Sequence, residues 1–106
     1  MSDELKNLLT ELKKGLAGLY GKRLKGVYLF GSYARGDFRD GSDVDVMIVL
    51  DDYLSYWQEL VNSGELVSNL SLQYGVSISR VLIRQQEWRN DDTPLLRNIR
   101  AEGVSA

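Results

Sequence analysis

The sequence contains no cysteine and no histidine. The lack of cysteine excludes a disulfide framework, a thiol nucleophile and a cysteine-ligated zinc site. The lack of histidine removes the imidazole ligands of most catalytic zinc sites. Carboxylates are therefore the metal ligands that remain, and they suit hard cations such as Mg²⁺ and Mn²⁺.

The sequence also lacks an excess of positive charge and any apolar run of transmembrane length. Thirteen Lys and Arg residues stand against fifteen Asp and Glu residues, for a net charge of −2. A protein that binds long nucleic acid by itself usually carries a basic face, so we do not expect long nucleic acid as the substrate. The first residues, Met1 to Glu4, have neither the basic start nor the apolar stretch of a signal peptide. We expect a cytoplasmic protein with no membrane contact.

What is present is the composition of one small α+β domain that spans residues 1–106. The chain is 43% hydrophobic and 26% charged, which is ordinary for globular proteins. Leucines from Leu5 to Leu19 recur at helical spacing after a cap at Ser2 or Asp3, although two glycines weaken the last turns. This pattern predicts an amphipathic helix that packs on a sheet.

A second helical pattern runs from near Tyr53 to Gly75, which suits a helix stop, and Gly64 interrupts it. We expect Trp57 in this helix to pack in the core. A third helix is expected after Thr93, since a cap followed by Pro94 fits the preferred start of a helix.

The segment that carries chemistry joins two apolar strands, residues 27–30 and 44–50. Gly31 and Ser32 follow the first strand, and Asp43 and Asp45 begin the second. Residues i and i+2 of a strand point to the same face, about 6.6 Å apart between Cα atoms. Both carboxylates can therefore converge on one metal site. Mg²⁺ accepts a few carboxylates together with phosphate oxygens and water, so two aspartates and a bound nucleotide suit it.

Gly31 and Ser32 sit where a strand ends and a short helix can begin. A glycine there lets the backbone approach a phosphate, and a serine can cap the helix and donate its hydroxyl. The N–H groups of a helix start favour anions. Taken singly, an Asp-x-Asp triplet often marks a solvated strand start and a Gly-Ser pair often marks a turn. The combination of the two motifs, each next to an apolar strand, is what indicates a site.

The spacing of Gly31-Ser32 and Asp43-Val44-Asp45, with ten residues between Ser32 and Asp43, resembles the signature of the DNA polymerase β-type nucleotidyltransferase superfamily. The short chain is similar to the minimal nucleotidyltransferases, whose members serve as antitoxins to HEPN-domain toxins. The resemblance covers about residues 25–84, with specific motifs only in 29–50.

This resemblance implies the polymerase β-type fold, a small mixed β-sheet covered by helices, with the site at the exposed end of the first two strands. It implies ATP as nucleotide, Mg²⁺ or Mn²⁺ held by Asp43 and Asp45, and a triphosphate held by Gly31 and Ser32. Arg35 is a candidate structural or phosphate contact. The implied reaction transfers AMP to a tyrosine hydroxyl of a HEPN toxin.

The third strand, expected at about residues 76–83, departs from the family pattern. Active members often have a third carboxylate there, whereas this sequence has Ser77 and Ser79. Serine is a weak neutral ligand and a poor base. Deprotonation of the acceptor would then need water, Glu87 or a group on the partner, and Glu87 is more commonly a helix-surface residue.

Several alternatives stay open at this stage. The chain can be an active enzyme, a catalytically weak relative that neutralises a toxin by binding alone, or a transferase for a small molecule. A hetero-oligomer with the toxin and a homodimer are both compatible with the sequence. Arg97 and Arg100 share a helix face that suits phosphates, an acidic partner or plain solvent.

Overall fold

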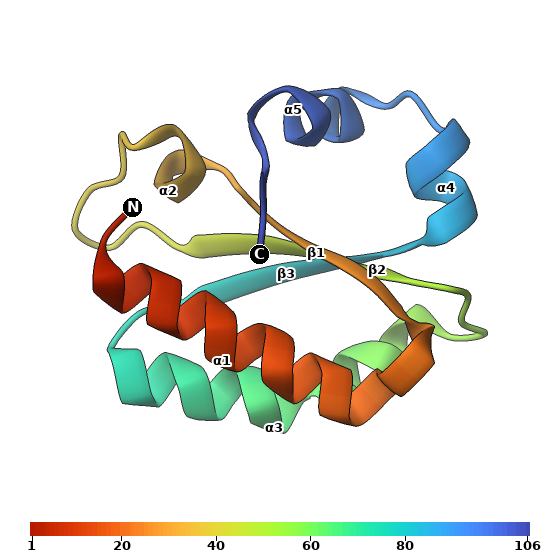
Figure 1. Ribbon diagram of the computed structural model, residues 1–106, viewed down its shortest axis with the longest axis horizontal. Coiled ribbons are helices and arrows are strands. Elements are labelled where there is room, and N and C mark those ends of the chain that lie inside the picture. Colours follow the sequence, from red (N-terminus) through yellow and green to blue (C-terminus); the bar gives the residue numbers. More distant parts are fainter.

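The computed structural model describes all 106 residues as a mixed sheet between two layers of helices. The elements in chain order are α1 (Asp3–Tyr20), the 3₁₀ turn η1 (Gly21–Arg23), β1 (Leu24–Phe30), α2 (Ser32–Arg35), β2 (Val44–Leu50), α3 (Tyr56–Tyr74), β3 (Ile78–Arg84), α4 (Gln85–Asn90), α5 (Pro94–Glu102) and β4 (Val104–Ser105). Figure 1 shows α1 and α3 on one side of the sheet, and α2 and α5 on the other. No helix has both the length and the apolar character needed to cross a bilayer.

The sheet has four strands in the order β3-β2-β1-β4. β1 is antiparallel to both β2 and β4, whereas β2 is parallel to β3 through the crossover helix α3. This mixed topology agrees with the α+β fold expected from the sequence. The two-residue strand β4 was not predicted, because such a short segment carries no periodicity.

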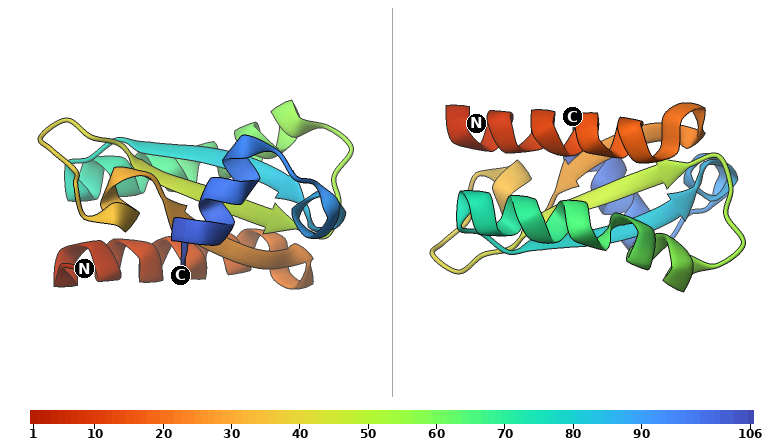
Figure 2. Two further views of the ribbon diagram at one scale, coloured as in Figure 1. Left: turned by 90° about the horizontal axis from the view of Figure 1, so that it is seen from above. Right: turned by 90° about the horizontal axis from the view of Figure 1, so that it is seen from below.

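Alternation along β2 divides the core between the two faces of the sheet. The larger core, formed with α1 and α3, takes Val44, Val46, Ile48 and Leu50 of this strand. The smaller core takes Met47 and Val49 from β2, with Ile83, Leu96 and Ile99 from β3 and α5. Figure 2 shows α5 over one face and the pair α1 and α3 over the other. A strand buried on both faces reads as a continuous apolar run, which is the pattern of residues 44–50.

α1 begins and packs as its sequence predicts. The Ser2 hydroxyl accepts a hydrogen bond from the Leu5 amide at 3.1 Å, which caps the helix. The helix continues through Gly15, where an added Cβ would lie 2.5 Å from Cδ1 of Leu66. Glycine at this position therefore lets α1 and α3 approach each other closely.

α3 is one continuous helix from the Ser55 cap to Gly75, whose φ of 66° suits the stop. Gly64 does not end the helix. The prediction that Trp57 packs in the core is wrong, because its side chain is 72% exposed. Ser63, Val67 and other residues of α3 face the sheet instead.

The C-terminal segment forms a second helical layer. The Thr93 hydroxyl accepts from the Leu96 amide at 3.2 Å, and Pro94 begins α5 as predicted. Neither arginine of the helix face is free of contacts. Arg97 lies 3.5 Å from Asp92, and the Arg100 guanidinium stacks 4.8 Å from the centre of the Trp88 ring and donates to the Trp88 carbonyl.

Candidate active site

The two aspartates lie where β1 ends and β2 begins. Asp45 pairs with Phe30, the last residue of β1, so the antiparallel register brings the start of β2 beside the loop that follows β1. Asp45 is half-buried and Asp43, just before the strand, is exposed. By strand alternation both carboxylates are on the face opposite to Val44, away from α1 and α3.

Gly31 is the residue that Asp45 packs against. A Cβ built on Gly31 would lie 2.3 Å from Oδ2 of Asp45, closer than any real contact. The backbone of Gly31 has φ 74° and ψ −157°, a region that only glycine adopts readily. Glycine is thus required twice at this position, for its conformation and for the room it leaves to the Asp45 carboxylate.

Ser32 begins the four-residue helix α2 but does not cap it. Gly31 is the N-cap and no side chain caps the helix, so the predicted capping role of Ser32 is wrong. The reason is local geometry: the chain has already turned at Gly31, and Ser32 is the first helical residue. The Ser32 carbonyl accepts from the amides of Gly36 and Asp37 at 2.9 and 3.1 Å, which closes the turn.

Arg35 stands at the end of α2 between two carboxylates. Its Nε lies 3.3 Å from Oδ2 of Asp37, and its Nη1 lies 3.5 Å from Oε2 of Glu102 on α5. Arg35 also lowers the pKa of Asp45 through its positive charge. Glu102 could not be identified from the sequence, because nothing along the chain indicates that α5 returns to the end of α2.

The pKa of Asp45 lies above its ordinary value. Burial is the main cause, the negative charge of Asp43 adds to it, and Arg35 opposes it. Burial and the charge of Asp43 therefore make ionisation of Asp45 less favourable, and a cation beside the Asp45 carboxylate would oppose this effect. The two carboxylates are therefore candidate ligands for a metal ion.

The Asp45→Asn variant is expected to unfold at a higher temperature than the native protein at pH 7 in EDTA. A carboxyl group whose pKa is raised by folding stabilises the folded protein below its unfolded pKa, and this contribution is lost as the pH rises through the folded pKa. Asparagine cannot ionise. We therefore expect the unfolding temperature of the variant to exceed that of the native protein by a few degrees at pH 7, and this difference to disappear below about pH 4.

Thermal unfolding followed by circular dichroism between pH 3 and pH 8 measures this difference. Asp40→Asn, on the exposed loop before β2, is the control and should change the midpoint little. A gain from Asp45→Asn that does not depend on pH would contradict the electrostatic explanation.

Of the two serines expected on the third strand, only Ser79 lies on it, because β3 begins at Ile78 and Ser77 just precedes it. Ser79 of β3 pairs with Asp45, so both side chains point to the same face of the sheet. No group of three or more acidic residues in the chain is arranged so that it could hold a metal ion. Glu87 is far from this point, because it contacts Arg84, which pairs with Leu50 at the opposite end of β2.

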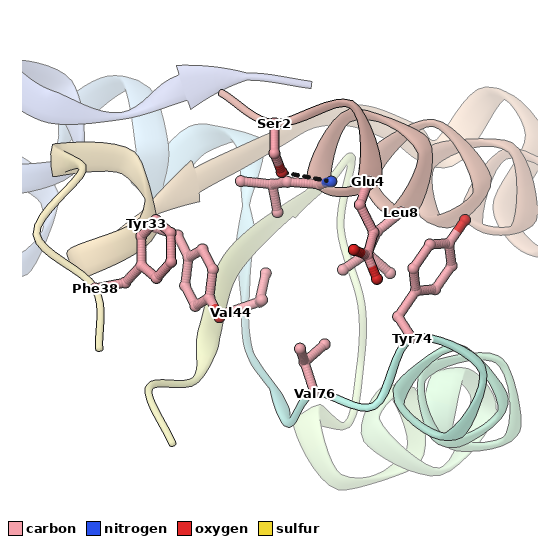
Figure 3. A pocket seen from close by; sticks show the side chains of 9 residues that line it. Ser2, Glu4, Leu8, Tyr33, Phe38, Val44, Tyr74 and Val76 are labelled. Carbon is pink, nitrogen blue, oxygen red and sulfur yellow. Dashed lines mark hydrogen bonds between the residues drawn. The ribbon is translucent and has the colours of Figure 1, made fainter. Parts of the chain in front are cut away.

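A cavity of about 180 Å³ lies close to the loop but on the other face of the sheet. Its wall includes Val44 and Val76, and the ring of Tyr33 stacks on that of Phe38 at its edge, with centroids 4.2 Å apart (Figure 3). Because Val44 and Asp45 point to opposite faces, the carboxylates do not line this cavity. The candidate site is an open surface, and the cavity is not part of it.

Known proteins share both sequence and fold with this chain. The profile of the nucleotidyltransferase domain family matches residues 9–102. A protein of Methanocaldococcus jannaschii assigned as a protein adenylyltransferase, MJ0141, is 34% identical over 84 residues, which cover 77% of this chain and 82% of that protein.

Solved structures of antitoxins are similar in fold. A crystal structure described as a toxin-antitoxin with AMP-PNP has a TM-score of 0.62 at 23% identity, covering 98% of this chain and 72% of the other. A structure of a tri-AMPylated Shewanella oneidensis HEPN toxin in complex with MNT antitoxin has a TM-score of 0.50 at 21% identity, covering 92% and 70%. At these identities the likeness establishes a shared fold.

Proposed function

The chain belongs to the nucleotidyltransferase domain family, and from this we propose that residues 1–106 form one minimal nucleotidyltransferase domain that transfers AMP from ATP to a hydroxyl of a HEPN-type toxin. The toxin would be silenced by the modification, so the chain would act as its antitoxin in the cytoplasm. The observation that carries the proposal is the contact between Asp45 and Gly31. Through this contact the carboxylate pair lies beside the loop after β1.

The residues present suit a divalent cation. Asp43 and Asp45 offer two carboxylates on one face of the sheet, and the pKa of Asp45 is raised first by burial and then by the negative charge of Asp43. These two residues would hold Mg²⁺ or Mn²⁺, with the remaining ligands supplied by nucleotide and water. When bound, the cation offsets negative charge on the triphosphate and on the leaving pyrophosphate.

The loop after β1 would hold the triphosphate. The first turn of a helix leaves N–H groups without intrahelical acceptors, and Gly31 has no side chain to keep a phosphate away from them. The Ser32 hydroxyl, at the first residue of α2, would donate to a phosphate oxygen. Arg35 can contribute positive charge once a phosphate competes with Asp37 and Glu102 for its guanidinium.

In the proposed reaction the acceptor oxygen attacks the α-phosphorus of ATP. The bond from that phosphorus to the oxygen bridging to the β-phosphorus breaks, and pyrophosphate leaves. The acceptor proton passes to water or to a basic group of the toxin, because the strand beside Asp45 offers Ser79 and no carboxylate. Tyrosine is the proposed acceptor, as in the antitoxins that the chain resembles.

Transfer of label from ATP to the toxin tests this proposal. The purified chain, a co-expressed HEPN partner and Mg²⁺ are incubated with ATP labelled either at the α-phosphate or at the γ-phosphate. Label on the toxin from the α-position alone supports AMP transfer. Label from the γ-position would indicate phosphorylation instead and would refute the proposed reaction.

A second function is favoured by Ser79. If the site lacks enough negative charge to hold the cation during turnover, the chain would neutralise the toxin by covering it. Under this alternative the Asp43→Asn, Asp45→Asn variant protects cells as well as the native chain does and still co-purifies with the toxin. Under the first proposal this variant protects poorly.

The Ser79→Asp variant is expected to bind Mn²⁺ or Mg²⁺ about tenfold more tightly, roughly 1.4 kcal/mol, because it places a third carboxylate beside Asp45. Isothermal titration calorimetry in the presence of a non-hydrolysable ATP analogue measures the affinity. Ser79→Asn, of similar size but uncharged, is the control. Equal affinities for the two variants would mean that the side chain at position 79 does not reach the metal site.

A further inference from the structure

The outer face of α3 carries a stripe of apolar side chains that nothing in the chain covers. Trp57 is 72% exposed, Val61 54% and Leu72 81%, and Leu54, just before the helix, is fully exposed. Residues 57, 61, 64, 68 and 72 follow one another at spacings of four or three, so they form a single line along the helix. Large apolar groups exposed together mark an interaction surface.

Charge is nearly absent from this helix. α3 carries only Glu59 and Glu65 among 19 residues, and Glu59 is buried against Arg23. By contrast, α1, which covers the same face of the sheet, has several acidic and basic residues along its exposed side. Loss of charge around exposed aromatic and aliphatic groups is the composition of an interface core, not of a solvated helix.

The stripe is complementary to itself. If a second copy of the helix packs antiparallel across a two-fold axis between Gly64 and Glu65, Trp57 meets the partner's Leu72 and Val61 meets the partner's Ser68. Large residues thus face large residues at the two ends, and a medium one faces a small one nearer the axis. At the axis the same register sets Gly64 against the partner's Glu65, which is exposed in the single chain, and glycine leaves room there for the longer side chain.

From this register we propose that α3 is the interface of a homodimer, formed by antiparallel packing of the stripe Trp57–Val61–Gly64–Ser68–Leu72 against the same stripe of a second copy. Two-fold, self-complementary contacts are the commonest way in which soluble chains associate. A surface used for a different protein has no need of such symmetry within one helix.

The area available is sufficient for a modest dimer. An exposed large apolar side chain presents roughly 100–250 Å², so the stripe with Leu54 offers on the order of 500 Å² per copy. A total of about 1,000 Å² lies at the low end of specific interfaces, where weak and transient association is found, so we expect a weak dimer. The stripe lies on the α1 and α3 side of the sheet, opposite to Asp45, so dimer formation leaves the candidate active site open (Figure 2).

Sedimentation equilibrium of the purified chain at about 1 to 200 µM tests the proposal, a range that brackets the expected affinity. We expect a monomer–dimer equilibrium that the Val61→Lys variant weakens at least tenfold, since two buried ammonium groups would then face the other helix. Val61 is exposed in the monomer, so the variant should remain folded. A native chain that is monomeric at every concentration would overturn the proposal.

Disulfide trapping tests the register without relying on affinity. The chain has no native cysteine that could form a competing disulfide. The double variant Val61→Cys, Ser68→Cys should form covalent dimers under mild oxidation. The matched pair Asn62→Cys, Asn69→Cys has the same spacing but lies to one side of the stripe, and should cross-link much less. Equal cross-linking of the two pairs, or cross-linking of Val61→Cys to a HEPN partner in place of a second copy, would refute the homodimer.

Discussion

The Asp43→Asn, Asp45→Asn variant is expected to lose AMP transfer by at least about a thousandfold, because the site would then lack the charge that holds a divalent cation worth several kcal/mol to the transition state. The fold should survive, since Asp43 is exposed and Asp45 is disfavoured in its ionised form by burial and by its neighbour. The variant therefore separates catalysis from folding.

The initial rate of AMP transfer to the toxin, with circular dichroism of each variant, measures this effect. Asp40→Asn removes one carboxylate from the same loop, and it should retain activity within a few-fold. Retention of transfer by the double variant would show that other groups hold the nucleotide and its cation.

The Gly31→Ala variant should lose about a hundredfold in activity and also be less stable than the native protein. The backbone at Gly31 lies in a region that costs other residues about 1–3 kcal/mol. The added methyl group would also overlap Oδ2 of Asp45 and push the carboxylate away. Displacement of a reacting group by about 1 Å is enough for a loss of this size.

Gly36→Ala provides the matched control for this prediction. Gly36 also has a positive φ, 84°, but nothing lies within 4 Å of the position of an added Cβ. It should therefore share the loss of stability, about 1–2 kcal/mol, without the loss of activity. If both variants were impaired equally in AMP transfer, backbone strain and not the position of Asp45 would be the cause.

The position of the candidate site could be predicted from the sequence because its residues lie in a short, local segment. Two apolar runs joined by a loop predict adjacent strands, and an antiparallel pair necessarily brings the end of the first, with Gly31, to the start of the second, with Asp45. The caps at Ser2 and Thr93 were equally local signals.

Other features depend on contacts that the sequence does not display. The pairing of Ser79 with Asp45 is fixed by how α3 crosses back to the sheet, and the contact of Arg35 with Glu102 by where α5 returns. The exposure of Trp57 was missed for a different reason. Periodicity identifies the apolar residues of a helix. It does not show which of two apolar faces is buried within the chain and which stays exposed.

The two proposed surfaces lie on opposite faces of the sheet, so they can be changed separately. Val61→Lys, on the α3 side, should weaken the dimer while AMP transfer continues. Asp45→Asn, on the α5 side, should stop transfer while the dimer persists. The failure of one proposal would thus leave the other standing.

The intact mass of the toxin after incubation with the chain, ATP and Mg²⁺ tests the central claim most directly. We predict that the toxin gains one or more AMP units with the native chain and none with Asp43→Asn, Asp45→Asn. An unmodified toxin that forms a stable complex with the native chain would contradict the enzymatic account, and would leave neutralisation by binding as the function.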